Sequence, residues 1–239
     1  MFSNRYILIY SAVMVIIVAV ALTFVAVLLK PAQINNIRVE KMQNILTSVN
    51  IESTPQTAEE LYNKFISESF VISTKGLVKK EIEAFDVDLY LEMKKKTEER
   101  NLPVFVCTKD DGSRYFIIPV RGKGLWGPLW GYVSLKDDFN TIEGTMFDHK
   151  GETPGLGAEI NTSAFQGQFI GKTIFDEKEN FVSVNVIKGG AKPDDMHGVD
   201  AISGGTITSQ GLEAMIRDGM NPYVAYFKEQ MKKNKMILK

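Results

Sequence analysis

The chain has 239 residues, a formal net charge of −1 and 44% hydrophobic residues, a composition typical of one globular domain with an appendage. The near-neutral charge excludes the broad basic surface that nucleic-acid binding needs. Cys107 is the only cysteine, so no intrachain disulfide can form, and with two distant histidines it offers no ligand set for zinc. We therefore expect neither a metal site nor a nucleic-acid partner.

A long uncharged stretch runs from Tyr6 to Leu29, after a short N-terminal tail of residues 1–5. As a helix with about 1.5 Å rise per residue, it exceeds the roughly 30 Å hydrocarbon core of a bilayer. It predicts a transmembrane helix held in membrane lipid. A cleaved signal peptide is a minor alternative, because the stretch is too long and the sequence around Leu29 lacks a small-x-small cleavage site.

Helical spacing of apolar residues continues from Ile34 to Val49 and predicts a stalk helix within residues 30–50. Residues 51–239 would then form the soluble domain. Thr57 and Glu60 match a capping box and predict a second helix that extends to Ile66. Basic residues after the span favour, weakly, a cytoplasmic location for the soluble domain.

From Leu102 onward the apolar pattern changes to that of strands. Residues 102–108 and 114–121 flank KDDGS, whose Asp-Gly pair predicts a β-hairpin. Further strands are expected at 131–138, 141–148 and 181–189, with a mixed loop and short helix at 155–172. Strands grouped between helices predict an α+β fold in which helices flank an antiparallel sheet.

Three sequence patterns imitate known motifs but do not meet their requirements. GKGLWG, residues 122–127, has the letters of a dinucleotide fingerprint, yet Pro128 and a strand follow where a helix is needed. GQFIGKT, residues 167–173, is one residue short of a phosphate-binding loop. AISGG resembles a nucleophile elbow around Ser203, but both histidines precede that serine, which is the wrong order for such a hydrolase.

Two glycine-rich stretches remain. DAISGGTITS, residues 200–209, precedes a helical pattern that ends near Gly219 and Pro222, so its simplest interpretation is a helix start. The candidate N-cap residues are Thr206, Thr208 and Ser209. HKGETPGLGAEI, residues 149–160, taken alone, is typical of a surface turn.

Together the two stretches carry a resemblance. GETPGLG followed downstream by D-x-x-S-G-x-T resembles the covalently flavinylated FMN-binding domain family of bacterial respiratory electron-transfer complexes. The stretches RGKGLWGPLWGYVSL, DEKENFVSVNVIKGGA and MHGVDAISGGTITSQG, with the single N-terminal span, are similar in particular to the C subunits of sodium-pumping NADH:quinone reductases (Nqr). The similarity runs over essentially the whole chain. The G subunits of Rnf complexes, coupled to ferredoxin and NAD, share both motifs and are the alternative.

The resemblance implies that a flavin transferase joins the phosphate of FMN to Thr206. Asp200 and Ser203 match the recognised positions of the motif, and Gly204 and Gly205 allow close backbone approach. Gly205 departs from the usual Ala, which puts the efficiency of modification in question.

GETPGLG is then expected to supply the flavin pocket. Leu156 would present an apolar surface to the isoalloxazine ring, with Glu152 and Thr153 as polar contacts. Gly155 and Gly157 complete the expected site.

The function that the resemblance implies is a one-electron relay. FMN would accept electrons from an iron centre in the membrane subunits and pass them to the FMN of a neighbouring subunit, in a complex that oxidises NADH, reduces quinone and exports sodium. The chain would have no catalytic residues of its own. Its domain would lie on the periplasmic side of the inner membrane, against the weak charge argument. Expected partners are the other subunits, the flavin transferase and membrane lipid. A membrane-anchored assembly subunit without a cofactor is the non-redox alternative.

Overall fold

The computed structural model describes residues 3–237, and the chain divides into two compact units, Met1–Lys41 and Met42–Lys239. The first unit consists mainly of the exposed part of helix α1 (Asn4–Thr47). Among the described residues, α1 is the helix long and apolar enough to cross a membrane, with a mean hydropathy of 3.2 in its most apolar window. The predicted span and stalk thus belong to one helix. Residues 1–2 of the predicted tail lie outside the described residues.

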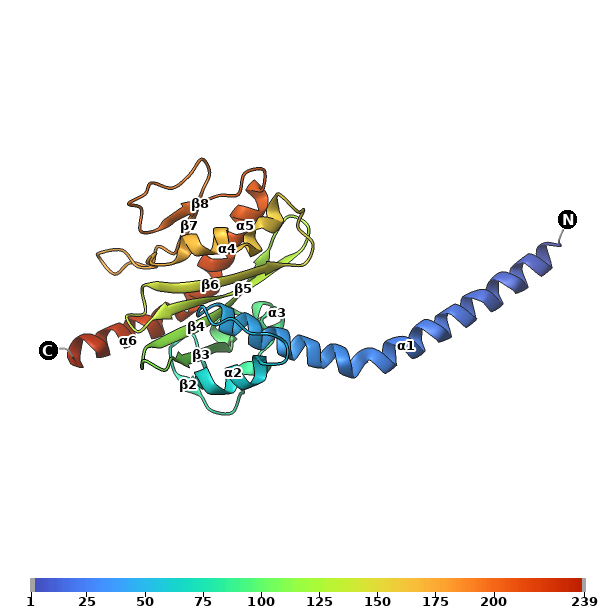
Figure 1. Cartoon of the computed structure of the whole chain (residues 1–239), viewed down its shortest axis with the longest axis horizontal. Helices are drawn as coiled ribbons and strands as arrows, with labels where there is room; N and C mark the ends of the chain where they lie inside the picture. The colour runs from blue at the N-terminus through green and yellow to red at the C-terminus, as the bar shows by residue number, and fades with distance from the viewer. Residues whose placement is uncertain (1–2, 238–239) are drawn as a thin grey trace. The chain divides into compact units, whose positions relative to one another are not determined.

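The second unit is built on an antiparallel sheet of six strands in the order β2-β1-β3-β4-β5-β6 (Figure 1). The strands are β1 (Ile66–Ile72), β2 (Val78–Lys79), β3 (Leu102–Thr108), β4 (Arg114–Lys123), β5 (Pro128–Lys136) and β6 (Ile142–His149). The predicted hairpin is β3 and β4, which pair from Phe105 with Ile117 to Thr108 with Arg114. The predicted α+β class and the antiparallel sheet are confirmed.

Strand β3 shows why this part of the sequence is so uniformly apolar. Val104 and Val106 face one hydrophobic cluster, while Phe105 and Cys107 face a second cluster on the opposite side of the sheet. Successive side chains of a strand point to opposite faces, so a strand covered on both sides needs a continuous apolar run. The sheet is therefore the middle layer of the unit.

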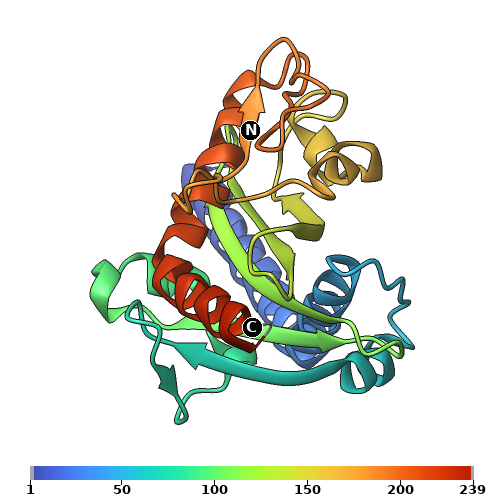
Figure 2. The ribbon, with the colours of Figure 1, turned by 90° about the vertical axis from the view of Figure 1, so that its left-hand side faces the viewer.

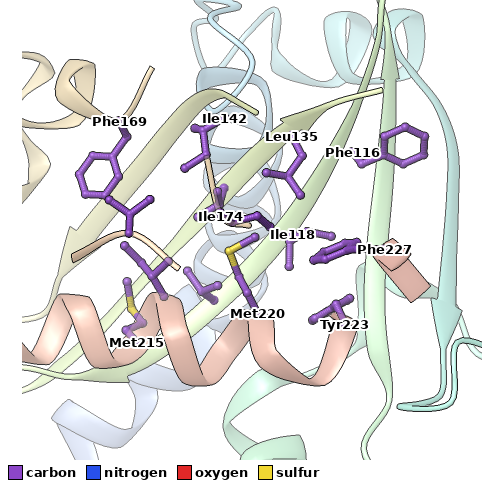
Figure 3. Close-up of a cluster of buried hydrophobic side chains, with 14 of the residues drawn as sticks. Phe116, Ile118, Leu135, Ile142, Phe169, Ile174, Met215, Met220, Tyr223 and Phe227 are labelled. Carbon is purple, nitrogen blue, oxygen red and sulfur yellow. The ribbon is translucent and has the colours of Figure 1, made fainter. Parts of the chain in front are cut away.

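Helices α5 (Thr206–Met220) and α6 (Val224–Ile237) cover one face of the sheet. Met215 and Met220 of α5 point toward the strands (Figure 3), and Phe227 of α6 and Phe116 of β4 both pack against the ring of Phe139. In Figure 2, α6 is the red helix that crosses the teal and green strands. The packing of α5 against β4 fixes where the N-terminal end of α5 lies, which matters for the site below.

The opposite face is covered by the last turns of α1 and the segment that follows. Ile45 and Val49 are fully buried against Val71, Phe105 and Ile117 of the strands. The core of the second unit therefore includes residues upstream of the predicted domain boundary at 51. The elements α2 (Ala58–Phe65) and η1 (Ala84–Asp86) complete this layer.

The remaining elements are short. They are α3 (Leu89–Met93), η2 (Thr97–Glu99), η3 (Gly157–Asn161), α4 (Ser163–Gln166), η4 (Gly167–Phe169), β7 (Asn185–Ile187), β8 (Gly198–Asp200) and η5 (Asn221–Tyr223). The strands β7 and β8 pair in parallel as a separate small sheet. The mixed loop with short helices expected at 155–172 is confirmed.

Three local predictions are wrong. The capping box is absent, because the Thr57 side chain hydrogen bonds with Thr54 and makes no cap to α2. Ile66 begins β1 and does not end the helix. Of the strand expected at 181–189, only β7 forms.

The predicted end of α5 is confirmed to within one residue, because the helix ends at Met220, directly after Gly219. Gly219 lies inside α5, and the chain continues through η5 into α6 with Pro222 within η5. A Cβ at Gly219 would come within 2.9 Å of a Val120 methyl group, so the glycine permits close packing of the helix on β4. Packing against the sheet stabilises helical backbone here despite the unfavourable helix propensity of glycine.

Candidate functional site

Three loop segments meet at the beginning of α5. The first is the β4–β5 connection, the second follows β6 from residue 150 to 157, and the third runs from 200 to 205. A Cβ added at Gly157 would collide with the Thr208 hydroxyl, and one at Gly205 would lie 3.3 Å from the Gly157 Cα. The two motifs that the resemblance links therefore lie against each other, although they are far apart in the sequence.

Glu152 is the residue that joins these segments. Its side chain is buried, and its Oε2 accepts a hydrogen bond of 2.5 Å from the Thr208 hydroxyl. Its Oε1 accepts from the backbone N–H of Trp126 at 2.9 Å. The Glu152 N–H in turn donates to His149 Nδ1 at the end of β6. Glu152 thus holds the first loop, the second loop and α5 together. The sequence predicts a polar contact to the flavin for this residue, whereas its carboxylate is buried and bonded to Trp126 and Thr208.

Sequence analysis missed the partners of this carboxylate. The sequence offers Thr208 only as a candidate N-cap, and Trp126 only as part of GKGLWG and of the stretch that carries the resemblance. A buried carboxylate needs hydrogen-bond donors. The need for such partners would therefore be evident only if the burial of Glu152 could be predicted. The sequence gives no sign of that burial.

The GETPGLG turn has a defined backbone conformation. Gly155 has φ = 74°, in the left-handed region that favours glycine. The N–H groups of Leu156 and Ala158 both donate to the Thr153 carbonyl at 3.1 Å. This turn leaves the Leu156 side chain 41% exposed.

Leu156 packs over the second glycine-rich motif. Gly204 has φ = 73°, and a Cβ there would lie 2.5 Å from a Leu156 methyl group. The Gly205 N–H donates to the Ile202 carbonyl and closes a tight turn, and the Ile202 N–H donates to the Ser209 hydroxyl. Both glycines are therefore needed for the close approach of the two motifs.

Asp200 and Ser203 have different surroundings. Asp200 is exposed, but its Oδ1 accepts from the Ala191 N–H at 2.7 Å, and its own N–H donates to Gln168. Ser203 is exposed on the turn. Asp200 therefore anchors the loop, whereas Ser203 is open to a second macromolecule.

The N-terminal end of α5 is not capped by a side chain. Gly205 is the N-cap, so the N-cap roles considered for Thr206, Thr208 and Ser209 are wrong. The first helical hydrogen bond runs from the Ser209 N–H to the Gly205 carbonyl. Within residues 3–237, the N–H groups of Thr206, Ile207 and Thr208 have no acceptor. The Thr206 side chain is exposed beside these free donors.

Exposed apolar side chains surround the same point. Trp126 is 69% exposed, Ile207 is 55% exposed, and Leu125 and Leu156 are also exposed. The last residues of GKGLWG connect β4 to β5, so the stretch is followed by a strand, as expected.

These residues fit an FMN group on structural grounds. Free N–H groups at a helix N-terminus favour a phosphate, and the Thr206 hydroxyl lies beside them. Leu156 offers an apolar surface, while Gly204 and Gly205 keep bulk away from the backbone. Thr153 is exposed at the turn and can serve as a polar contact.

Comparison with known proteins gives the same picture. The FMN-binding domain family (FMN_bind) matches residues 124–221, which include all three loops and α5. The C subunit of the Na(+)-translocating NADH-quinone reductase of Haemophilus ducreyi is 31% identical over 223 residues, covering 85% of this chain and 86% of the relative. The protein of the same name from Pseudomonas aeruginosa is 29% identical and covers 91% of this chain and 94% of the relative.

Two solved structures are also similar to this chain. The crystal structure of the C subunit of the Na(+)-translocating NADH-quinone reductase from Parabacteroides distasonis has a TM-score of 0.77 and 42% identity, and the match covers 83% of this chain and 96% of that one. Shewanella oneidensis NqrC has a TM-score of 0.70 and 29% identity, with 82% of this chain covered and 98% of that one.

Proposed function

This chain belongs to the NqrC family, the C subunits of Na(+)-translocating NADH-quinone reductases, and on that premise we propose that it relays electrons inside such a complex through a bound FMN. The relatives are named as subunits of a reductase, so other subunits of a complex are its partners. When bound, FMN supplies one-electron transfer, and the protein supplies position and electrostatic surroundings. The oxidation of NADH, the reduction of quinone and the transport of sodium belong to the complex as a whole.

We propose further that FMN is attached covalently through a phosphoester to Thr206. The observation that carries this proposal is the exposed Thr206 side chain beside three backbone N–H groups that have no acceptor among the described residues. A flavin transferase would move FMN from FAD to the Thr206 oxygen, with AMP as the leaving group. The N-terminal end of α5 would then stabilise the attached phosphate.

Residues of the GETPGLG turn would bind the flavin or position the groups that do. Leu156 would contact the ring, with Gly155 and Gly157 fixing its turn. Glu152 would position both loops without touching the flavin, and Thr153 would be an exposed polar contact.

Asp200 and Ser203 would serve maturation. The transferase would recognise the exposed turn that carries them, and the hydrogen bond from Ala191 to Asp200 would keep the turn in one conformation. Gly204 and Gly205 would allow its active site to approach Thr206 closely.

We assign residues 6–29 to a single membrane crossing, residues 30–50 to a stalk and residues 51–239 to the FMN domain, whose core also takes in the buried end of the stalk from Met42 onward. The apolar first part of α1 supports the crossing, since its side chains are exposed and its length exceeds the hydrocarbon core. By analogy with the family, the FMN domain would lie on the periplasmic side of the inner membrane.

The experiment is co-expression of the chain with a flavin transferase, followed by proteolysis and peptide mass spectrometry. We expect the FMN adduct on the peptide that contains Thr206, and none in Thr206→Ala. Thr206→Ser should retain part of the adduct because the attacking oxygen remains. Ser163→Ala is the matched control, since it removes an exposed hydroxyl of the same domain outside both glycine-rich motifs and should leave the adduct in place.

An adduct that persists in Thr206→Ala would show that another residue carries the flavin. Absence of any adduct in the wild type, with a control substrate flavinylated in the same cells, would refute covalent attachment.

A further inference from the structure

A groove separate from the candidate FMN site lies between α3 and α5, over the ends of β4 and β5. Its volume is about 610 Å³, and Met93, Pro128 and Met215 are among its apolar lining residues. Volumes of roughly 300–1,000 Å³ are typical of binding pockets. The groove is therefore large enough to hold several side chains of another molecule.

The charged residues that line this groove are mostly basic. They are Lys94, Arg121 and Lys123, against a single acid, Asp218. None of the three basic residues has an ion pair with an acid among residues 3–237. We call this feature the cationic groove.

Two of the cations lie at the ring of Tyr90. The Lys94 ammonium lies 3.9 Å from the centre of the Tyr90 ring, and the Arg121 guanidinium carbon lies 5.6 Å from it. A cation over an aromatic face is stabilised by the ring, but the ring does not neutralise its charge. Since neither cation is paired with a carboxylate of the described residues, the charge pattern of the groove is complementary to carboxylates of a partner.

The groove is elongated. A second cavity of about 350 Å³ shares Met93, Arg121 and Asp218 with the first and continues to Pro222 and Tyr223. An extended peptide segment could contact both cavities at once, whereas a compact ligand would occupy only one of them.

The other charged residues that line the second cavity are already engaged. Glu92 accepts hydrogen bonds from Lys95 and Asn101, and Arg100 donates to the carbonyl oxygens of Lys95 and Met93. The charged groups of the elongated groove that remain available to a partner are therefore mainly the basic residues Lys94, Arg121 and Lys123.

We propose that the cationic groove binds an acidic, extended segment of a neighbouring subunit, with an apolar side chain between Met93 and Met215 and carboxylates against Lys94, Arg121 and Lys123. The proposal rests on the proposed function only in assuming that the chain works in a complex. The β4–β5 connection forms one wall of the groove and also carries Trp126, whose N–H is bound by Glu152. A segment docked here is therefore held beside the candidate FMN site.

The test uses the assembled complex with a photo-crosslinking amino acid, benzoylphenylalanine, in place of Met93, which is 46% exposed in the groove. After irradiation, proteolysis and mass spectrometry identify the crosslinked peptide. We expect a peptide of another subunit that contains at least two Asp or Glu residues close in sequence to the crosslinked position. The same crosslinker at Leu77, exposed on the β1–β2 turn, is the positional control and should not capture that peptide.

Charge reversal gives the second arm. Lys94→Glu with Arg121→Glu should lower the crosslink yield by at least about tenfold, because like charges would then face each other. Lys75→Glu on the β1–β2 turn, combined with Lys80→Glu directly after β2, changes the net charge by the same amount and should leave the yield unchanged. Covalent flavin fluorescence in denaturing gels, measured on every variant, reports that the domain folds and matures.

A crosslink to lipid, to a peptide without acidic residues or to no other subunit would overturn the proposal, as would an unchanged yield after charge reversal in the groove. The two proposals fail separately: the wild type without covalent flavin but with the acidic crosslink would refute only the attachment to Thr206, while normal flavin content without the crosslink would refute only the groove.

Discussion

The hydrogen bond between Thr208 and Glu152 provides the most direct test of how the site is built. Thr208→Val keeps the size and branching of the side chain but removes the hydroxyl that donates to Glu152 Oε2 at 2.5 Å. The Thr208 side chain is buried, so water does not readily replace the lost donor. Thr208→Ser is the matched control, because it keeps the donor and removes only a methyl group.

The expected magnitudes separate the two variants. A hydrogen bond to a charged group contributes about 1.5–3 kcal/mol, and leaving the partner unsatisfied in the interior adds to that loss. We therefore expect Thr208→Val to lower the free energy of unfolding by at least about 2 kcal/mol. Thr208→Ser should cost about 1 kcal/mol, the value for one buried methyl group.

Glu152→Gln shows whether the charge of the carboxylate or its hydrogen bonds contribute more to the stability of the domain. The amide oxygen can accept from the Trp126 N–H while the amide nitrogen donates to the Thr208 hydroxyl, so both links survive with one direction reversed. We expect this variant to be less destabilised than Thr208→Val. Combined with Thr208→Val, it leaves the amide nitrogen without an acceptor, and the two effects should not be additive.

The assay is urea unfolding of a fragment that begins at Ile34, followed by fluorescence and circular dichroism, with equal m-values required for comparison. A Thr208→Val fragment as stable as the Thr208→Ser fragment would refute the view that this hydrogen bond holds α5 to the second loop. The fragment retains the buried end of α1, including Met42, which the core requires.

Three further outcomes follow from the structure. The fragment from Ile34 should remain monodisperse without detergent by size-exclusion chromatography; aggregation would mean that the FMN domain needs the removed residues. Leu156→Asp should leave covalent flavin on Thr206 but lower the flavin midpoint potential, because the new charge disfavours added electrons; an unchanged potential in a spectroelectrochemical titration would place Leu156 away from the ring. Burial raises the pKa of the Cys107 thiol to about 11 from its usual 9, with Lys109 opposing and Glu143 adding to the effect. The unfolded chain then loses this proton first, so stability should fall between pH 9 and 11, and the urea midpoint of Cys107→Ala should fall less steeply with pH in that range.

The sequence predicts the parts of the fold whose signals are local. The β3–β4 hairpin follows from two apolar runs and an Asp-Gly turn, and α1 follows from its uninterrupted apolar stretch. Strand β1 was missed because ISESFVI is largely polar at its start and directly follows the helical spacing of α2 without Gly or Pro. Its pairing with β3 decides its conformation, and that partner is distant in the sequence.

The motifs of the candidate site could be predicted from the sequence, but the hydrogen bonds that connect them could not. The resemblance linked GETPGLG to D-x-x-S-G-x-T, and the structure brings them together. The hydrogen bond from Thr208 to Glu152 joins residues 56 positions apart, and no periodicity signals such a pair. The stop signals at Gly219 and Pro222, by contrast, are local, and they predict the end of α5 at Met220 to within one residue.

The spacing of the two threonines in GGTIT would let one motif carry the proposed attachment atom and also hold α5 in place. Successive residues of an α-helix are rotated by about 100°, so Thr206 and Thr208 differ by about 200° and point to opposite sides of α5. Thr206 is exposed, whereas Thr208 is buried against Glu152. A hydroxyl for attachment therefore needs no adjustment of the hydroxyl that fixes the helix. Inserting or deleting one residue between them would rotate one of these side chains by about 100°, so the spacing of the two threonines constrains this motif as well as their identity.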